Sequence, residues 1–567
     1  MTASGHAMRA CACTLAAALV LAGCSSGPGF LAPDDTPQSV YGSFLAARYA
    51  SANRDVDQSA RLYADALAFE PNSGLISERA FLSALMAGDF PRADQAALAA
   101  GDEEGATALV HLYLAAAELA GARFDRPAAP SGAPDAFSDF TGAIIDQWAK
   151  VRARRVDEAL AAADQVSSPF ARAGQLLIQR AMLLERAGDH DRAESAYRAA
   201  DATLNLPDHT AVLLGEFLER RGRRTEAAAL YRGRLDVGRS PGDPAVAAAL
   251  QRIEDGRRAP RFPRPDEAAA RALFAPAALL TRQAPADYSA LFLRTVERLD
   301  PDFQRNTFAL AQILEELELD EAALAAYRSI TEGPFATRAG VQAAWLAFQS
   351  GDRDAAIAEA RALVEADGAE TARLVLADML RASERCSEAA RIYEQVAARR
   401  AEAGVEPDWR HVYYAGVCRQ VSEGWQSAEP LFLQALDLAP DEPQVLNHLG
   451  YNWIVRDRRV EEGFTLVARA AERAPENGAV LDSLGWGHFK QGRVEEAVRW
   501  LEDAAALSPD NPTINWHLGD AYAAAGRDLE ARFQWRRALE LDPGERERTL
   551  IEQRLEGGLQ AGPADLQ

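Results

Sequence analysis

The chain has 567 residues, with 61 lysines and arginines against 84 aspartates and glutamates, which gives a net charge of −23 at pH 7. A surface this acidic repels nucleic acid and anionic lipid head groups, so charge excludes both as partners. Hydrophobic residues make up 48% of the chain and are mainly alanine and leucine, and no strand-rich block occurs. We therefore expect an all-α protein.

The N-terminal segment has the layout of a secretory signal. One basic residue, Arg9, precedes the apolar run from Cys11 to Ala22. This run is about half of the ~20 residues that a helix needs to span a bilayer, so residues 1–23 are expected to be a cleaved signal peptide rather than a membrane span. Translation can start at Met1 or at Met8, because the segment from Met8 onward is already a complete signal.

The apolar run ends in Leu21-Ala22-Gly23-Cys24, which resembles the lipobox of bacterial lipoproteins. The resemblance implies that Cys24 becomes the first mature residue and carries fatty acyl chains such as palmitate. Ser25 follows instead of the aspartate that holds lipoproteins in the inner membrane, which implies the periplasmic face of the outer membrane. The alternative is an ordinary signal peptide with a chance cysteine. Residues 24–38, rich in Ser, Gly, Pro and Asp, are expected to form a flexible tether.

Near the C-terminus the sequence repeats with a period of 34. Gly485 and Gly519, Ala497 and Ala531, Ala504 and Ala538, and Pro509 and Pro543 are each separated by this interval. The period and the residue types resemble the tetratricopeptide repeat, a pair of antiparallel helices. Four clear copies occupy residues 409–543. The resemblance implies a right-handed superhelical solenoid with a concave groove.

Weaker copies extend upstream, so the whole folded part is expected to be one solenoid in two lobes. Ala159, Ala193 and Ala227 keep the interval of 34. We assign residues 39–255 to an N-terminal helical lobe, 256–265 to a Pro/Arg-rich joint, 266–408 to a degenerate repeat region and 544–567 to a capping helix and tail.

No group of residues in the sequence supports catalysis, so we expect no enzymatic activity, no cofactor and no metal. Residues 238–242 spell a nucleophile-elbow motif, but Pro241 has no N–H to donate to an oxyanion hole. His448, His488 and His517 fall in successive repeats without the i, i+4 pairing of a zinc site, so structural roles are expected for them.

In the tetratricopeptide family two positions of each first helix face the groove. The candidate partner-binding residues at these positions are Tyr413, Asn447, Tyr451, Asp482, Trp486, Trp516 and Asp520. Aromatic groups on an open concave wall anchor partner chains. The alternative is that the terminal helix or neighbouring turns cover some of them.

Two cysteines remain in the folded part, Cys386 near a repeat turn and Cys418 in the next first helix. An oxidising periplasm permits a disulfide between them, but sequence alone does not give their separation, so pairing stays open.

The motif Leu481-Asp482-Ser483-Leu484-Gly485-Trp486, behind a lipobox and a long repeat array, resembles a narrower family. These are outer-membrane tetratricopeptide lipoproteins of Gram-negative bacteria that bind a periplasmic carboxyl-terminal processing protease. The resemblance implies a scaffold or adaptor that brings the protease to cell-wall hydrolases as substrates. The alternative is a structural role in an outer-membrane assembly or export machinery.

Overall fold

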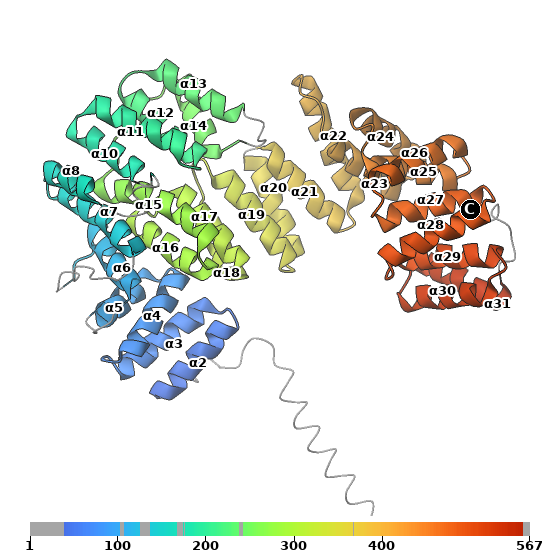
Figure 1. Cartoon of the computed structure of the whole chain (residues 1–567), viewed down its shortest axis with the longest axis horizontal. Coiled ribbons are helices and arrows are strands. Elements are labelled where there is room, and N and C mark those ends of the chain that lie inside the picture. Colours follow the sequence, from blue (N-terminus) through green and yellow to red (C-terminus); the bar gives the residue numbers. More distant parts are fainter. Residues whose placement is uncertain are drawn as a thin grey trace, which may run out of the picture. The chain divides into compact units, whose positions relative to one another are not determined.

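The computed structural model describes residues 39–101, 107–124, 136–166, 174, 176–236, 242–366 and 368–558. The predicted signal peptide, Cys24, the tether and most of the 238–242 motif lie outside these residues. Every regular element in the described ranges is an α-helix (Figure 1). The predicted all-α fold is therefore confirmed.

The structure divides into two compact units, residues 1–346 and 347–567. The helices of unit 1 are α2 (Val40–Ala52), α3 (Val56–Phe69), α4 (Gly74–Ala87), α5 (Phe90–Gly101), α6 (Ala108–Leu119), α7 (Ala136–Arg152), α8 (Val156–Gln165), α10 (Leu177–Ala187), α11 (His190–Thr203), α12 (Pro207–Arg220), α13 (Arg224–Leu235), α14 (Pro244–Glu254), α15 (Pro265–Gln283), α16 (Ala286–Leu299), α17 (Gln304–Glu316), α18 (Asp320–Ser329) and α19 (Ala336–Gln349), whose last residues pass into unit 2.

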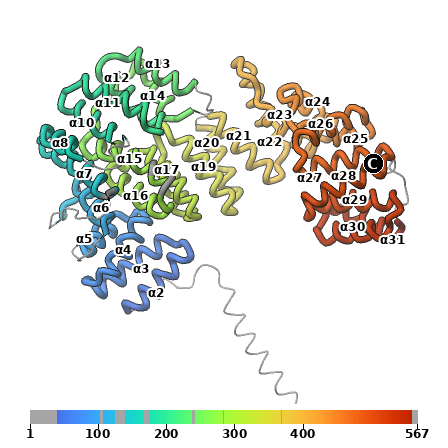
Figure 2. Tube along the Cα trace, in the orientation of Figure 1, coloured from blue at the N-terminus to red at the C-terminus, as the bar shows by residue number. Residues whose placement is uncertain are grey.

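The remaining helices belong to unit 2 and follow one another as successive pairs (Figure 2). They are α20 (Arg353–Ala366), α21 (Glu370–Ala382), α22 (Cys386–Glu402), α23 (Trp409–Glu423), α24 (Trp425–Leu438), α25 (Pro443–Val455), α26 (Val460–Arg473), α27 (Gly478–Lys490), α28 (Val494–Leu507), α29 (Pro512–Ala524), α30 (Asp528–Glu540) and α31 (Glu545–Gly557). The four copies expected at 409–543 coincide with the pairs from α23 to α30, and α31 follows the last pair.

The helix boundaries of these repeats have local causes. Asn477 and Asn511, 34 residues apart, are the N-caps of α27 and α29, and each side chain accepts hydrogen bonds from two backbone N–H groups of the first turn. Such a cap satisfies donors that the helix itself cannot pair. Gly492 and Gly526 have φ of +73° and +75° in the turn between the paired helices, a conformation that glycine adopts without strain.

Small residues let the paired helices approach closely. A Cβ at Gly450 would lie 2.6 Å from the carbonyl oxygen of Gly463, and a Cβ at Gly463 would lie 2.7 Å from that of Gly450, so α25 and α26 touch backbone to backbone. In the following pairs Gly485 faces Leu501, and Gly519 faces Trp535. Each large side chain fills the space that the glycine leaves open.

Unit 1 folds back on itself, unlike a solenoid in which each repeat touches only its neighbours. In Figure 1, α15 and α16 lie beside the much earlier helices α6 and α7. Arg294 of α16 donates a hydrogen bond to the carbonyl of Met86 at 3.3 Å, and Arg298 pairs with Asp94 at 3.1 Å. Contacts across about 200 residues therefore close unit 1.

The segment 256–265, predicted to be a joint between two lobes, lies inside unit 1. Arg224 donates hydrogen bonds to the carbonyls of Ile253 and Arg257, at 3.1 and 2.8 Å. The ring of Phe262 packs near that of Trp148, with centroids 6.5 Å apart. The prolines thus shape an ordered connection from α14 to α15 rather than a hinge.

The close approach of α25 and α26 at Gly450 predicts that adding a methyl group there lowers the stability of the fold. In Gly450→Ala the new methyl group would clash with backbone and with Val467, and we expect a loss of about 1–3 kcal/mol of stability. Gly233→Ala is the control, because Gly233 lies in α13 with open space around its Cα, and there we expect a gain of about 0.5–1 kcal/mol. Urea unfolding followed by circular dichroism measures both. Equal stability of the two variants would contradict the close crossing.

Candidate functional site

The seven residues predicted to line the groove lie on the first helices α23, α25, α27 and α29 of unit 2. Tyr413, Asp482, Trp486 and Asp520 are buried, whereas Asn447, Tyr451 and Trp516 are half-buried. Trp486 is 3% exposed and Tyr413 is 6% exposed. The expectation of an open aromatic wall is thus corrected for these two residues, and the alternative of covered side chains holds for them.

Trp486 is covered by the next repeat. Its indole stacks on the imidazole of His517 with centroids 4.0 Å apart and 17° between the planes, and on Phe489 at 4.8 Å. His517 in turn has its Nδ1 2.8 and 3.0 Å from the two carboxylate oxygens of Asp482. The residues at 482, 486 and 517 therefore form one buried contact between α27 and α29.

Asp520 is covered by the capping helix. Its carboxylate is fully buried and accepts hydrogen bonds from Trp535 Nε1 at 2.9 Å and from Arg554 Nε of α31 at 3.1 Å. Burial raises the pKa of Asp520 although Arg554 and Trp535 oppose this shift. Removing Arg554 would leave a buried carboxylate without its countercharge, so this pair fixes α31 on the last repeat.

Tyr413 belongs to a polar network between α23 and α25. Its hydroxyl lies 3.3 Å from His448 Nδ1, and His448 Nε2 lies 2.9 Å from Gln420 Oε1. The neutral imidazole satisfies both contacts, with Nε2–H donating and Nδ1 accepting. Burial lowers the pKa of His448 from 6.5 to about 4, and Arg456 adds to this effect.

The half-buried members keep polar atoms without partners. Asn447 Oδ1 and Trp516 Nε1 have no hydrogen-bond partner within the described ranges. Burial and the nearby Asp482 raise the pKa of Tyr451. The two polar atoms without partners are themselves buried, so only other parts of the half-buried Asn447, Tyr451 and Trp516 stay exposed, a narrower set than the sequence predicted.

Cys386 and Cys418 are both free and buried, on α22 and α23. Burial and a hydrogen bond with Cys386 raise the pKa of the Cys418 thiol to about 12. The two thiols are therefore neighbours, and burial disfavours the thiolate form of Cys418.

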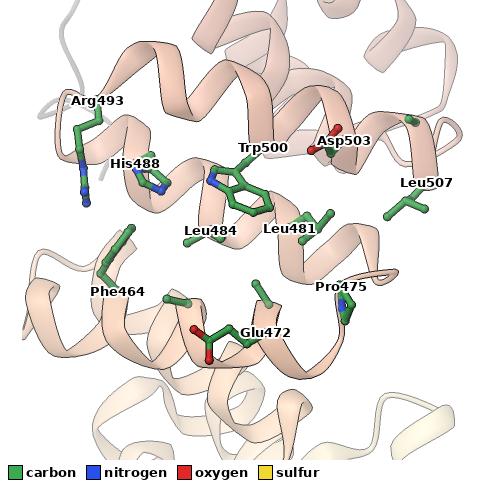
Figure 3. Close-up of a pocket in the computed structure, with 13 residues that line it drawn as sticks. Phe464, Glu472, Pro475, Leu481, Leu484, His488, Arg493, Trp500, Asp503 and Leu507 are labelled. Carbon is green, nitrogen blue, oxygen red and sulfur yellow. The ribbon is translucent and has the colours of Figure 1, made fainter.

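A pocket of about 650 Å³ lies between α26, α27 and α28 (Figure 3). Apolar side chains form its body, and they include Phe464, Leu481, Leu484 and Trp500. Sequence reasoning missed this pocket because it considered only the groove-facing positions of the first helices, and the pocket is formed largely by the second helices.

The described residues contain no group of three or more histidine, cysteine and acidic side chains placed to hold a metal ion. Among the same residues, no helix has the length and apolar character needed to cross a bilayer.

Comparison with known proteins identifies the repeats. Family models described as "TPR repeat" or "Tetratricopeptide repeat" match residues 210–245, 341–418 and 488–526. The matched stretches are tetratricopeptide repeats. The match at 341–418 falls largely in the region that the sequence marked as degenerate. Tetratricopeptide arrays are scaffolds for protein interaction, with large concave surfaces built from stacked helix pairs.

One relative and several solved structures are similar to parts of the chain. The "TPR repeat-containing protein PA4667" of Pseudomonas aeruginosa is 37% identical over 81 residues, and the matched stretch is 14% of each chain. The structure of the APC/C hetero-tetramer Cut9-Hcn1 covers 92% of this chain and 97% of its own, at 11% identity and a TM-score of 0.38. A tetratricopeptide protein from Parabacteroides merdae covers 45% of this chain and 97% of its own, at 11% identity and a TM-score of 0.36.

The His448 network predicts a dependence of stability on pH. Because the folded-state pKa lies below the unfolded value, the unfolded chain binds the extra proton first, and stability is lost as the pH falls from about 6.5 towards 4. We expect His448 to account for about 1–2 kcal/mol of the loss between pH 7 and pH 5. Urea unfolding of wild type and His448→Gln at both pH values isolates this share. The same pH dependence in both proteins would contradict a neutral imidazole at this position.

Proposed function

We propose that the protein is a non-enzymatic adaptor lipoprotein that binds segments of other proteins through unit 2. The observation that carries the proposal is an open apolar pocket that extends into the tetratricopeptide repeat matched at residues 488–526. A pocket of this volume accepts apolar side chains, and the polar groups at its ends give direction to a bound chain. The exposed parts of the half-buried Asn447, Tyr451 and Trp516 would offer further contacts.

Anchoring through Cys24 to the periplasmic face of the outer membrane is part of the proposal. It is supported by the lipobox-like tetrapeptide ending in Cys24 and by Ser25 after it. A lipid anchor followed by a flexible tether would hold both units near the membrane while leaving them free to meet periplasmic proteins.

The partner class follows from the motif at 481–486, which resembles that of lipoproteins binding a carboxyl-terminal processing protease. Under this proposal the array recruits the protease and its cell-wall hydrolase substrates. A second candidate function is a structural role in an outer-membrane assembly or export machinery, which the same array of repeats would also suit.

Affinity purification tests the partner class. Tagged lipoprotein, extracted from its own envelope in mild detergent and analysed by mass spectrometry, is expected to retain a processing protease and hydrolases. An untagged strain processed in parallel controls for background. Recovery of assembly or export components without protease would favour the second function, and recovery of no envelope protein would refute the scaffold.

A separate substitution tests the anchor. Cys24→Ser removes the thiol that would be acylated, so we expect an uncleaved or soluble protein with unchanged helicity. Membrane fractionation and mass spectrometry of the N-terminal peptide provide the readout. If the Cys24→Ser protein still fractionates with the outer membrane and the wild type carries no acyl group, the lipoprotein assignment fails.

A further inference from the structure

Three of the four repeats from α23 to α30 share a polar contact between neighbouring repeats. In each, the side chain three residues after the helix-crossing glycine donates to a carboxylate on the preceding second helix. The pairs are Arg419 with Glu394 at 2.7 Å, Trp453 with Glu429 at 2.6 Å, and Tyr522 with Glu502 at 2.8 Å. The carboxylate thus satisfies the hydrogen-bond donor of a side chain that is partly buried between successive repeats.

His488 of α27 occupies the same position but has no such carboxylate. The preceding helix, α26, carries Ala468 at the position that Glu502 occupies 34 residues later, and Phe464 at the position equivalent to Glu429. The imidazole is only 9% exposed, and its Nδ1 has no hydrogen-bond partner within the described ranges. It meets the ring of Phe464 edge-on at 4.9 Å.

Arg493 lacks the same carboxylate. Its counterpart 34 residues later, Arg527, donates to Glu502 at 3.1 Å. The guanidinium of Arg493 instead lies over the ring of Phe464, 4.5 Å from its centroid, and forms no ion pair with any described residue. In the next repeat Tyr522 and Arg527 both donate to Glu502. Their counterparts His488 and Arg493 both lack this carboxylate.

The absent carboxylate coincides with the pocket of about 650 Å³. Figure 3 shows His488 and Arg493 at one end of it, with Trp500, Leu484 and Leu481 along its body. A volume of this size accepts one or two large apolar side chains beside the polar end.

The charges around the pocket differ along its length. Glu472 and Asp503 also line the pocket, and both lie farther from Arg493 than His488 lies (Figure 3). Both carboxylates are exposed, and neither forms an ion pair with a residue that the structure describes. On a chain of net charge −23, an acidic ligand group is repelled nearly everywhere, so it would be attracted locally to the end with Arg493.

We propose that this pocket docks a segment of a partner protein that places a side-chain carboxylate against His488 and Arg493 and inserts a neighbouring apolar side chain beside Trp500. The ligand carboxylate takes the place that Glu502 has in the next repeat. The site extends the proposed scaffold function and rests on it, because it names which surface of unit 2 binds and what chemistry it selects.

Ala468→Glu is the most informative variant, because it supplies the carboxylate from the chain itself. The new side chain would accept from His488 and Arg493 as Glu502 does from Tyr522 and Arg527, so the variant should be at least as stable as wild type while its pocket is closed. Glu502→Ala is the matched control. It removes the corresponding carboxylate one repeat later and should leave the pocket unchanged.

The probe is a phage-displayed library of random peptides, presented between two coat-protein segments and panned on the immobilised mature chain. We expect enriched sequences to combine aspartate or glutamate with an adjacent aromatic or aliphatic residue. Affinity of the synthetic peptides, measured by fluorescence anisotropy, should fall at least about tenfold with Ala468→Glu and with Arg493→Gln, and stay unchanged with Glu502→Ala.

Three outcomes would contradict the site. The enriched peptides could lack acidic residues, or they could bind only through a free C-terminal carboxylate in a parallel C-terminal display. The third outcome is an unchanged affinity for a stably folded Ala468→Glu protein. No enrichment at all would also reject it. The scaffold function is judged separately by the affinity purification, which would still recover a partner if only the pocket assignment were wrong.

Discussion

The close approach of paired helices is the constraint on which the rest of unit 2 depends. Where α25 crosses α26, Gly450 and Gly463 leave no room for a methyl group between the two backbones. One side chain per pair, such as Trp535 opposite Gly519, then fills the space beside the crossing. Because the pairs from α23 to α30 each have a glycine at the crossing, at intervals of 34 or 35 residues, each second helix presents corresponding positions to the following repeat, and a single substitution there changes the contact between them.

The period of about 34 predicts the helix pairs from α23 to α30, because caps, turns and crossings are local features. Asn477, Gly485 and Gly492 each act within one repeat, and their counterparts Asn511, Gly519 and Gly526 act in the same way. The closure of unit 1 was not predictable in this manner. Arg294 and Met86 are about 200 residues apart, and nothing in the local pattern announces their hydrogen bond.

In the candidate site, too, contacts between distant parts of the chain could not be predicted from the local sequence pattern. The family offsets place Trp486 and Asp520 at equivalent positions of their helices, but an offset does not state what covers a position. His517 covers the first and Arg554 the second, and both come from elements about one repeat farther along the chain. The pocket could be found in the sequence only by comparing the repeats with one another. The alignment shows that Ala468 occupies the position that Glu502 has in the next repeat, so a carboxylate is missing there.

The two units are stabilised over different distances in the sequence, and this affects how each would unfold. In unit 2 the contacts join neighbouring helices, so repeats can open one after another from the end where Arg554 holds α31. In unit 1 the bonds of Arg294 and Arg298 tie α16 to helices near the start of the chain, so its early and late parts lose structure together. Pulling on the chain or cutting it with a protease would therefore give graded intermediates from unit 2 and an all-or-none loss from unit 1.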